Sequence, residues 1–114
     1  MSNCLFCKII KKEIPAEIVF EDEGIIAIRD INPQAPVHLL VIPKKHFSTV
    51  LDIQEEDHEL IGCVFSVANH LAIEEGVDRS GFRLVVNCGE GAGQSVFHIH
   101  YHLLGGRPLQ WPPG

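Results

Sequence analysis

The sequence predicts an α+β fold in which about five strands form a mainly antiparallel sheet with one long helix and one short helix. Three observations support this prediction. Short β-like runs are separated by turn residues, one long segment has apolar residues at the 3–4 residue spacing of a helix, and strands do not alternate regularly with helices. No repeat or linker divides the chain, so residues 1–114 are expected to form a single domain.

The expected strands are short runs rich in apolar and β-branched residues, and turn residues bound them. They cover residues 17–20, 25–30, 37–42, 82–87 and 96–104. Pro43 ends the third strand, because proline has no N–H to donate to a neighbouring strand. A glycine-rich loop is expected to join the last two strands.

The two helices are expected at residues 4–12 and 55–75. In the longer one, Asp52 and Glu55 are placed to form a capping box at the start, and Gly76 is placed to end the helix. Its apolar residues form one stripe, which consists of Leu60, Ile61, Val64, Phe65, Ala68, Leu71 and Ala72.

Composition and charge exclude several classes of function. The formal net charge is −6 and basic residues cluster only as Lys11-Lys12 and Lys44-Lys45, so no broad surface for nucleic acid or an anionic membrane is expected. The chain has neither the ~18 consecutive apolar residues of a membrane span nor a secretory signal pattern. We therefore expect a cytoplasmic protein with reduced cysteines. Because the chain is short and 46% of its residues are hydrophobic, we also expect it to pair with a second copy of itself.

Three of the seven histidines stand at alternate positions, 98, 100 and 102. On a strand their rings face the same side, while Ile99, Tyr101 and Leu103 face the other. Alternate residues are about 6.6 Å apart, so the three rings cannot all bind one ion, and the row is expected to serve more than one task. The alternative is a histidine-rich strand that stabilises a core or an interface.

Near the N-terminus, Cys4 and Cys7 form a C-x-x-C pair, which is half of many structural zinc sites. The candidate partners are His46 and one end of the histidine row. Two packed thiols are one alternative. A redox-active pair is another, although such pairs usually lie where a strand meets a helix in a βαβ unit.

The loop before the histidine row contains Gly89, Gly91 and Gly93, followed by Gln94 and Ser95. Glycines let backbone N–H groups converge on an anion, and the two polar side chains add donors. The loop is therefore a plausible phosphate cradle, although a plain hairpin turn fits the same residues. The ending of a P-loop is absent.

Taken together, these motifs resemble the Hint branch of the histidine-triad (HIT) superfamily. Residues 98–104 fit its His-φ-His-φ-His-φ-φ signature, in which φ is an apolar residue. The resemblance covers nearly the whole chain and also rests on residues 8–16, 36–46, 93–95 and 111–114. It implies a HIT-like fold and a hydrolase that cleaves purine nucleoside 5′-monophosphoramidates, such as AMP-NH2 and lysine-linked AMP, through a nucleotidyl-histidine intermediate.

The resemblance also implies a role for each histidine. His100 would be the nucleophile, and His38 would orient its ring from the neighbouring strand. His98 and His102 would flank the nucleophile, with His102 in contact with the phosphate and the leaving group. Ser95 would hold the phosphate or assist departure of the amine.

For the nucleotide, such as AMP or GMP, the resemblance implies a pocket built from several segments. Gly93 and Gln94 would lie at the phosphate, Asn87 near the sugar and phosphate, and Asp30 at the ribose hydroxyls. The base would lie among Phe6, Ile9, Ile31 and Leu40.

The resemblance further implies Zn²⁺ held by Cys4, Cys7, His46 and His98, with no cofactor needed for catalysis. It implies a homodimer in which the tail carrying Trp111 approaches the partner's active site. Two other functions fit the same motifs: hydrolysis of dinucleoside polyphosphates, as in the Fhit branch, and a nucleotide-binding adaptor without catalysis.

Overall fold

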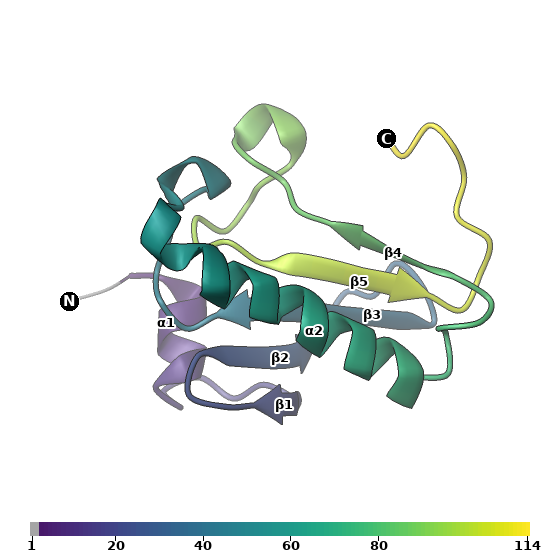
Figure 1. Ribbon diagram of the computed structural model, residues 1–114, viewed down its shortest axis with the longest axis horizontal. Helices are drawn as coiled ribbons and strands as arrows, with labels where there is room; N and C mark the ends of the chain where they lie inside the picture. Colours follow the sequence, from purple (N-terminus) through teal and green to yellow (C-terminus); the bar gives the residue numbers. More distant parts are fainter. Residues whose placement is uncertain (1–2) are drawn as a thin grey trace.

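The computed structural model describes residues 3–114, in which two helices cover opposite faces of one five-stranded sheet (Figure 1). The order across the sheet is β1-β2-β3-β5-β4, and each neighbouring pair is antiparallel. The strands are β1 (Ile18–Glu21), β2 (Ile25–Arg29), β3 (Val37–Pro43), β4 (Phe82–Val85) and β5 (Tyr101–Gly105). The helices are α1 (Leu5–Ile10) and α2 (His58–Glu74), and 3-10 turns cover Val50–Asp52, Glu55–Asp57 and Glu90–Ala92.

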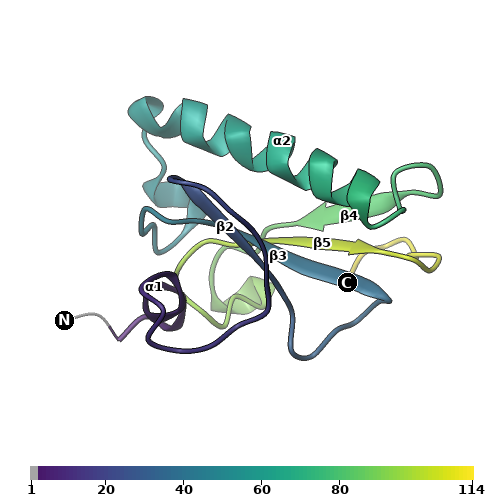
Figure 2. The ribbon, with the colours of Figure 1, turned by 90° about the horizontal axis from the view of Figure 1, so that it is seen from below.

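Alternation along the central strands separates two cores. Figure 2 shows α2 on one side of the sheet and α1 on the other. Leu39 and Val41 of β3 lie in the larger core with residues of α2, whereas Leu40 and Ile42 lie in the smaller core with residues of α1. All seven residues of β3 are buried, because both faces of the strand are covered. The same alternation places His38 on the α1 side of the sheet.

The last predicted strand is the main correction to the sequence analysis. β5 begins at Tyr101 rather than at residue 96, so His98 and His100 precede it. The pairing with β3 stops at Val41 and Tyr101, two residues before Pro43, which cannot donate to a neighbour. Ile99, Tyr101 and Leu103 nevertheless all lie in the α2-side core, as predicted.

The helix ends also differ from the prediction. α1 is shorter than residues 4–12, because Lys12 has a φ of 65°, outside the helical region. The predicted capping box of Asp52 with Glu55 is wrong. The carboxylate of Asp52 instead accepts a hydrogen bond from the backbone N–H of Thr49 (3.1 Å), in the 3-10 turn that precedes α2. Gly76, with a φ of 75°, follows the end of α2 as expected.

The remaining strand boundaries shift by one or two residues, and β4 ends at Val85 instead of residue 87. α2 begins at His58, three residues later than predicted, because Glu55–Asp57 form a 3-10 turn. Along α2, the predicted apolar stripe is only partly buried, since the Phe65 side chain is exposed at the surface. Neither helix in the described residues has the length and apolar character needed to cross a bilayer.

Candidate active site and metal centre

The three histidines of the row lie in three different environments on the α1 side of the sheet. His98 is fully buried beside Cys4 and Cys7, His100 borders a pocket, and His102 pairs with His38. The three rings therefore do not converge on one common site, and the prediction that the row serves more than one task is compatible with their positions.

His100 has the geometry of a nitrogen nucleophile. Its Nδ1 lies 2.8 Å from the carbonyl oxygen of His98, and because a carbonyl can only accept, Nδ1 carries the proton. Nε2 therefore keeps its lone pair. The ring contacts the edge of Phe6, with centroids 4.9 Å apart. Burial lowers the pKa of His100, which keeps the ring neutral near pH 7.

A chain of hydrogen bonds fixes the tautomers of His38 and His102. The backbone N–H of Gln34 donates to Nδ1 of His38 (3.0 Å), so His38 carries its proton on Nε2. That nitrogen lies 2.9 Å from Nδ1 of His102 and 3.3 Å from the carboxylate of Asp30. His102 thus accepts at Nδ1 and keeps a proton on Nε2.

The expectation that His38 orients His100 is therefore wrong, because its hydrogen bond goes to His102. The register explains the difference. His38 lies opposite Leu104 and Leu40 lies opposite His102, so His38 and His102 are diagonal neighbours on one face of the sheet. His100 precedes β5 and uses the His98 carbonyl instead.

Burial is the main cause of the lowered pKa values in this pair. It lowers the pKa of His38, and it lowers that of His102 to about 4, with smaller contributions from His100 and His38. The Asp30 carboxylate acts in the opposite direction on both rings. Both histidines are consequently neutral near pH 7, so His102 can present a hydrogen-bond donor without a permanent charge.

A pocket of about 370 Å³ opens beside His100 and His102. Its wall contains most of the residues predicted for the nucleotide: Phe6, Ile9, Asp30, Ile31, Leu40 and Ser95. Ile31 stands at the rim and is 99% exposed. Sequence reasoning missed several apolar lining residues, namely Leu5, Ile14, Pro15, Ala16, Ile28 and Val96. Only the packing of α1 and the segment after it against the sheet brings them to the pocket.

Gln94 does not act as predicted. Its side chain is buried, and its amide nitrogen donates to the carbonyls of Ser48 (2.7 Å) and Val96 (3.1 Å). Its amide oxygen accepts from the N–H of Gly89 (2.8 Å). Because both amide hydrogens are used, the Gln94 side chain stabilises the 89–95 loop and offers no donor to a phosphate. Within this loop Gly93 has a φ of 94°, a conformation that favours glycine.

Asn87 lies in a second pocket, of about 380 Å³, which also contains His38 and His102. The C-terminal tail forms part of its wall through Leu109 and Pro113. The tail thus lies beside the histidines of its own chain, and its expected approach to a partner's active site stays a prediction.

The C-x-x-C pair and two histidines form a compact cluster at the start of α1. One ligand atom from each of Cys4, Cys7, His46 and His98 lies within 4.8 Å of the other three. Nδ1 of His98 is 3.4 Å from Sγ of Cys4 and 3.5 Å from Sγ of Cys7, and it is 3.0 Å from Nδ1 of His46. Four ligands around a tetrahedral zinc ion are roughly 3.4–3.8 Å apart, so this donor set fits zinc.

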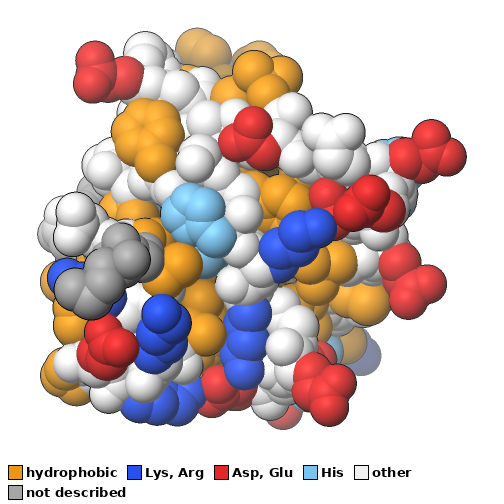
Figure 3. All heavy atoms as spheres, turned by 90° about the vertical axis from the view of Figure 1, so that its left-hand side faces the viewer, with side chains coloured by type: hydrophobic (Ala, Val, Ile, Leu, Met, Phe, Trp, Pro, Cys, Tyr) orange, Lys and Arg blue, Asp and Glu red, His pale blue; other side chains and the backbone are white. Residues whose placement is uncertain are grey.

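Hydrogen bonds from neighbouring groups also orient two of the four candidate ligands. Nε2 of His98 lies 2.7 Å from the carbonyl of Pro43, which fixes the proton on Nε2 and leaves a lone pair on Nδ1. The backbone N–H of Cys7 points to Sγ of Cys4 (3.4 Å). Histidine atoms reach the surface on the face of the molecule shown in Figure 3, and His46 is the exposed histidine of the cluster.

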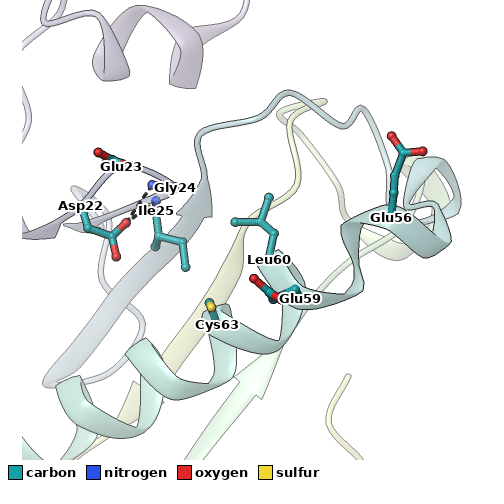
Figure 4. A pocket seen from close by; sticks show the side chains of 8 residues that line it. All are labelled: Asp22, Glu23, Gly24, Ile25, Glu56, Glu59, Leu60 and Cys63. Atoms are coloured by element: carbon teal, nitrogen blue, oxygen red, sulfur yellow. Dashed lines mark hydrogen bonds between the residues drawn. The ribbon is translucent and has the colours of Figure 1, made fainter.

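A larger pocket, of about 670 Å³, lies away from the histidines, between the β1–β2 turn and the start of α2 (Figure 4). Four acidic residues line it: Asp22, Glu23, Glu56 and Glu59. The carboxylate of Asp22 is already used, since it accepts from the N–H groups of Gly24 (2.9 Å) and Ile25 (2.8 Å). The Asp22 carboxylate thus stabilises the β1–β2 turn and is not available to a ligand. The pocket beside His100 and His102 is therefore the stronger candidate site.

Comparisons with known proteins agree with this choice. A protein-family model described as "Scavenger mRNA decapping enzyme C-term binding" matches residues 3–108. A HIT-like protein of Synechocystis is 51% identical over 112 residues, which are 98% of this chain and 97% of the relative. A 14 kDa zinc-binding protein of Zea mays is 54% identical over 115 residues, which are 99% of this chain and 89% of the relative.

Solved structures give the same result. A HIT family hydrolase from Legionella pneumophila has a TM-score of 0.97 at 57% identity, over 98% of this chain and 100% of that chain. A histidine triad protein from Clostridium difficile has a TM-score of 0.92 at 44% identity, over 96% of both chains. These matches confirm the predicted fold class over nearly the whole chain.

Proposed function

This chain belongs to the histidine-triad (HIT) family, and we propose that it is a hydrolase that releases AMP or GMP from purine nucleoside 5′-monophosphoramidates. The observation that carries the proposal is the hydrogen bond from His100 Nδ1 to the His98 carbonyl, which leaves a lone pair on Nε2 beside a pocket. A nucleotide-binding adaptor would not need a neutral imidazole held in this way.

The pocket provides a matching surface for each part of a purine nucleotide. The base fits among Phe6, Ile9 and Leu40, which are apolar and at least nine-tenths buried. We assign the ribose hydroxyls to the carboxylate of Asp30, which lines the same pocket. The phosphate then lies near Ser95 and the rings of His100 and His102, where the 89–95 loop ends.

In the first step Nε2 of His100 attacks the phosphorus, and the P–N bond to the amine breaks. The positive charge that develops on the imidazole is stabilised by the His98 carbonyl, which accepts from Nδ1. A phosphate beside His102 raises the pKa of that ring, so Nδ1 takes up a proton from solvent while the Nε2–H of His38 donates to the Asp30 carboxylate instead. The ring then passes its Nε2 proton to the leaving nitrogen. The products are a free amine and a nucleotidyl-His100.

In the second step water attacks the same phosphorus, and the bond to His100 breaks. The proton of the water passes to His102, so the proton spent on the amine is restored. Imidazole suits both steps, because it is a good nucleophile and a good leaving group. AMP leaves, and His100 returns to its neutral form.

We propose that Zn²⁺ binds Cys4, Cys7, His46 and His98, where it would hold the start of α1 against the end of β3 without entering the reaction. His98 links this cluster to the nucleophile, because its ring belongs to the cluster and its carbonyl accepts from His100. A homodimer is also part of the proposal, since Phe65 and Ile73 expose apolar surface on α2.

The replacement His100→Asn tests this function. We expect it to lower kcat/KM for AMP-NH2 by at least about 10³-fold and to abolish covalent labelling by an activated AMP analogue, because the attacking nitrogen is lost. His70→Asn is the matched control, since His70 is exposed on α2 and contacts Glu74 (3.1 Å). Near-normal turnover by His100→Asn would refute the mechanism.

A further inference from the structure

The two pockets around the histidines meet at His102. The nucleotide pocket contains His100 and His102, while the second pocket contains His38, His102 and Asn87. His102 is the lining residue that both pockets share, and His100 belongs to the first alone. The two spaces therefore adjoin at the side chain of His102.

The geometry of displacement at phosphorus indicates which part of the substrate would enter the second pocket. In a displacement at phosphorus, the attacking and leaving atoms lie roughly in line on opposite sides of the phosphorus. Because the attacking nitrogen of His100 belongs to the first pocket, the leaving group departs away from it. His102, which serves the leaving nitrogen, stands between the two spaces.

The second pocket is cationic in an acidic protein. Among its described lining residues, the charged side chains are those of Arg83 and Arg107, and no carboxylate is present, although the net charge of the chain is −6. Arg83 alternates on β4 with Phe82 and Leu84, which pack against the α2-side core. Its side chain consequently reaches the face that holds the histidines.

Both arginines are held in place by neutral partners. Nη2 of Arg83 donates to the carbonyl of Gln110 (2.9 Å), and Nε of Arg107 donates to the carbonyl of Gln34 (3.0 Å). Carbonyls orient a guanidinium without cancelling its charge. Arg29 shows the contrast, because two carboxylates, those of Glu17 and Glu75, neutralise it.

We infer that the second pocket receives the leaving group and favours one that carries a negative charge, either a carboxylate on the departing amine or a phosphate. This inference rests on the proposed function and adds the substrate class to it. Arg83 and Arg107 are the specificity-determining residues. The tail contributes by closing the pocket, since the bond from Arg83 to Gln110 fixes it there.

The test compares two substrates of nearly equal size, AMP joined through a P–N bond to glycine or to glycinamide, which differ by one negative charge. We expect the wild type to favour the glycine conjugate by about tenfold in kcat/KM, the effect of one charge-assisted contact. Arg83→Gln combined with Arg107→Gln brings the ratio close to one. Arg83→Lys with Arg107→Lys keeps most of it, and Arg79→Gln, an exposed control, keeps all of it.

Diadenosine tetraphosphate distinguishes the two sources of charge. A higher kcat/KM than for the glycine conjugate, lost in the double glutamine variant, assigns the pocket to a phosphate leaving group. The reverse order assigns it to a carboxylate. Equal values for the glycine and glycinamide conjugates in the wild type, or a ratio unchanged in the double glutamine variant, would overturn the inference.

Binding separates this inference from the proposed function. In His100→Asn, which does not turn over, calorimetry gives the Kd values of the two conjugates directly. We expect the glycine conjugate to bind about tenfold more tightly than the glycinamide conjugate, and we expect this difference to disappear when Arg83 and Arg107 are also replaced by glutamine. That result supports the inferred charge preference of the second pocket even if the wild type hydrolyses neither conjugate. Equal Kd values overturn it whatever the activity, whereas absence of hydrolysis in the wild type counts against the proposed function alone.

Discussion

His98 and His102 are the two ends of one histidine row, and both lie on the α1 side of the sheet, yet their rings are prepared for different tasks. Nε2 of His98 is bound to the Pro43 carbonyl, so Nδ1 offers a lone pair to the cysteine cluster. Nδ1 of His102 accepts from His38, so Nε2 keeps a proton beside the pocket. The partner of one ring nitrogen decides what the other can do.

The comparison also explains why His100 stands between them. Its Nδ1 uses the backbone carbonyl of His98, and its ring contacts Phe6, which also contacts His98. One end of the row therefore provides a fixed support, and the other end provides a proton donor. Three predictions test whether the two ends are as different as their hydrogen bonds indicate.

The largest effect is expected at the His98 end. Cys7→Ser removes a thiolate ligand, and we expect the protein to lose about one equivalent of zinc and at least about 10 °C in Tm, because metal binding energy contributes directly to folding. Elemental analysis and thermal unfolding measure both. Cys63→Ser is the control, since Cys63 is exposed on α2. A wild-type protein without zinc, with a Tm unaffected by chelator, would contradict the metal centre.

A smaller effect is expected at the His102 end, and it concerns rate more than stability. His38→Phe removes the donor to Nδ1 of His102, so His102 can adopt the other tautomer. We expect kcat for AMP-NH2 to fall by about 10²-fold while KM changes little. His38→Gln restores part of the rate, because its amide can donate to the same nitrogen.

Nitrogen-15 NMR gives a readout that loss of packing alone would not move. In the wild type the His102 ring should show protonated Nε2, and in His38→Phe it should show a mixture of tautomers. A rate loss without a change in tautomer would mean that His38 acts by filling space. Activity equal to wild type in His38→Phe would remove the proposed hydrogen-bond chain from the mechanism.

These sites show which features the sequence can predict. Residues close together in the chain were enough to predict that the three histidines share one face, opposite Ile99, Tyr101 and Leu103. They were also enough to predict the C-x-x-C pair and the strand at residues 37–42. The partner of His38 could not be found in this way, because it depends on the register between β3 and β5, two strands about 60 residues apart in sequence. Gln94 is similar, since its partner Ser48 lies in a distant loop that only the fold brings near.

The smallest effect is a dependence of stability on pH that belongs to His102. Burial lowers its pKa in the folded state to about 4 from the ordinary 6.5. Between these values the unfolded chain takes up a proton that the folded protein refuses, so the free energy of unfolding falls as the pH drops from 6.5 toward 4. The groups that face the ring are His38, His100 and the carboxylate of Asp30, and the carboxylate reduces the shift.

Chemical denaturation of the wild type and of His102→Asn at pH 7.5, 6 and 5 isolates this contribution. Both proteins keep the cysteine cluster, so the effect of pH on metal binding cancels in the difference between them. We expect the wild type to lose more stability than the variant as the pH falls, because only the wild type carries the His102 ring, whereas both proteins keep His38 and His100 with their lowered pKa values. Equal losses would show that His102 is solvated and readily protonated, and the proposed contrast with His98 would then rest on the metal alone.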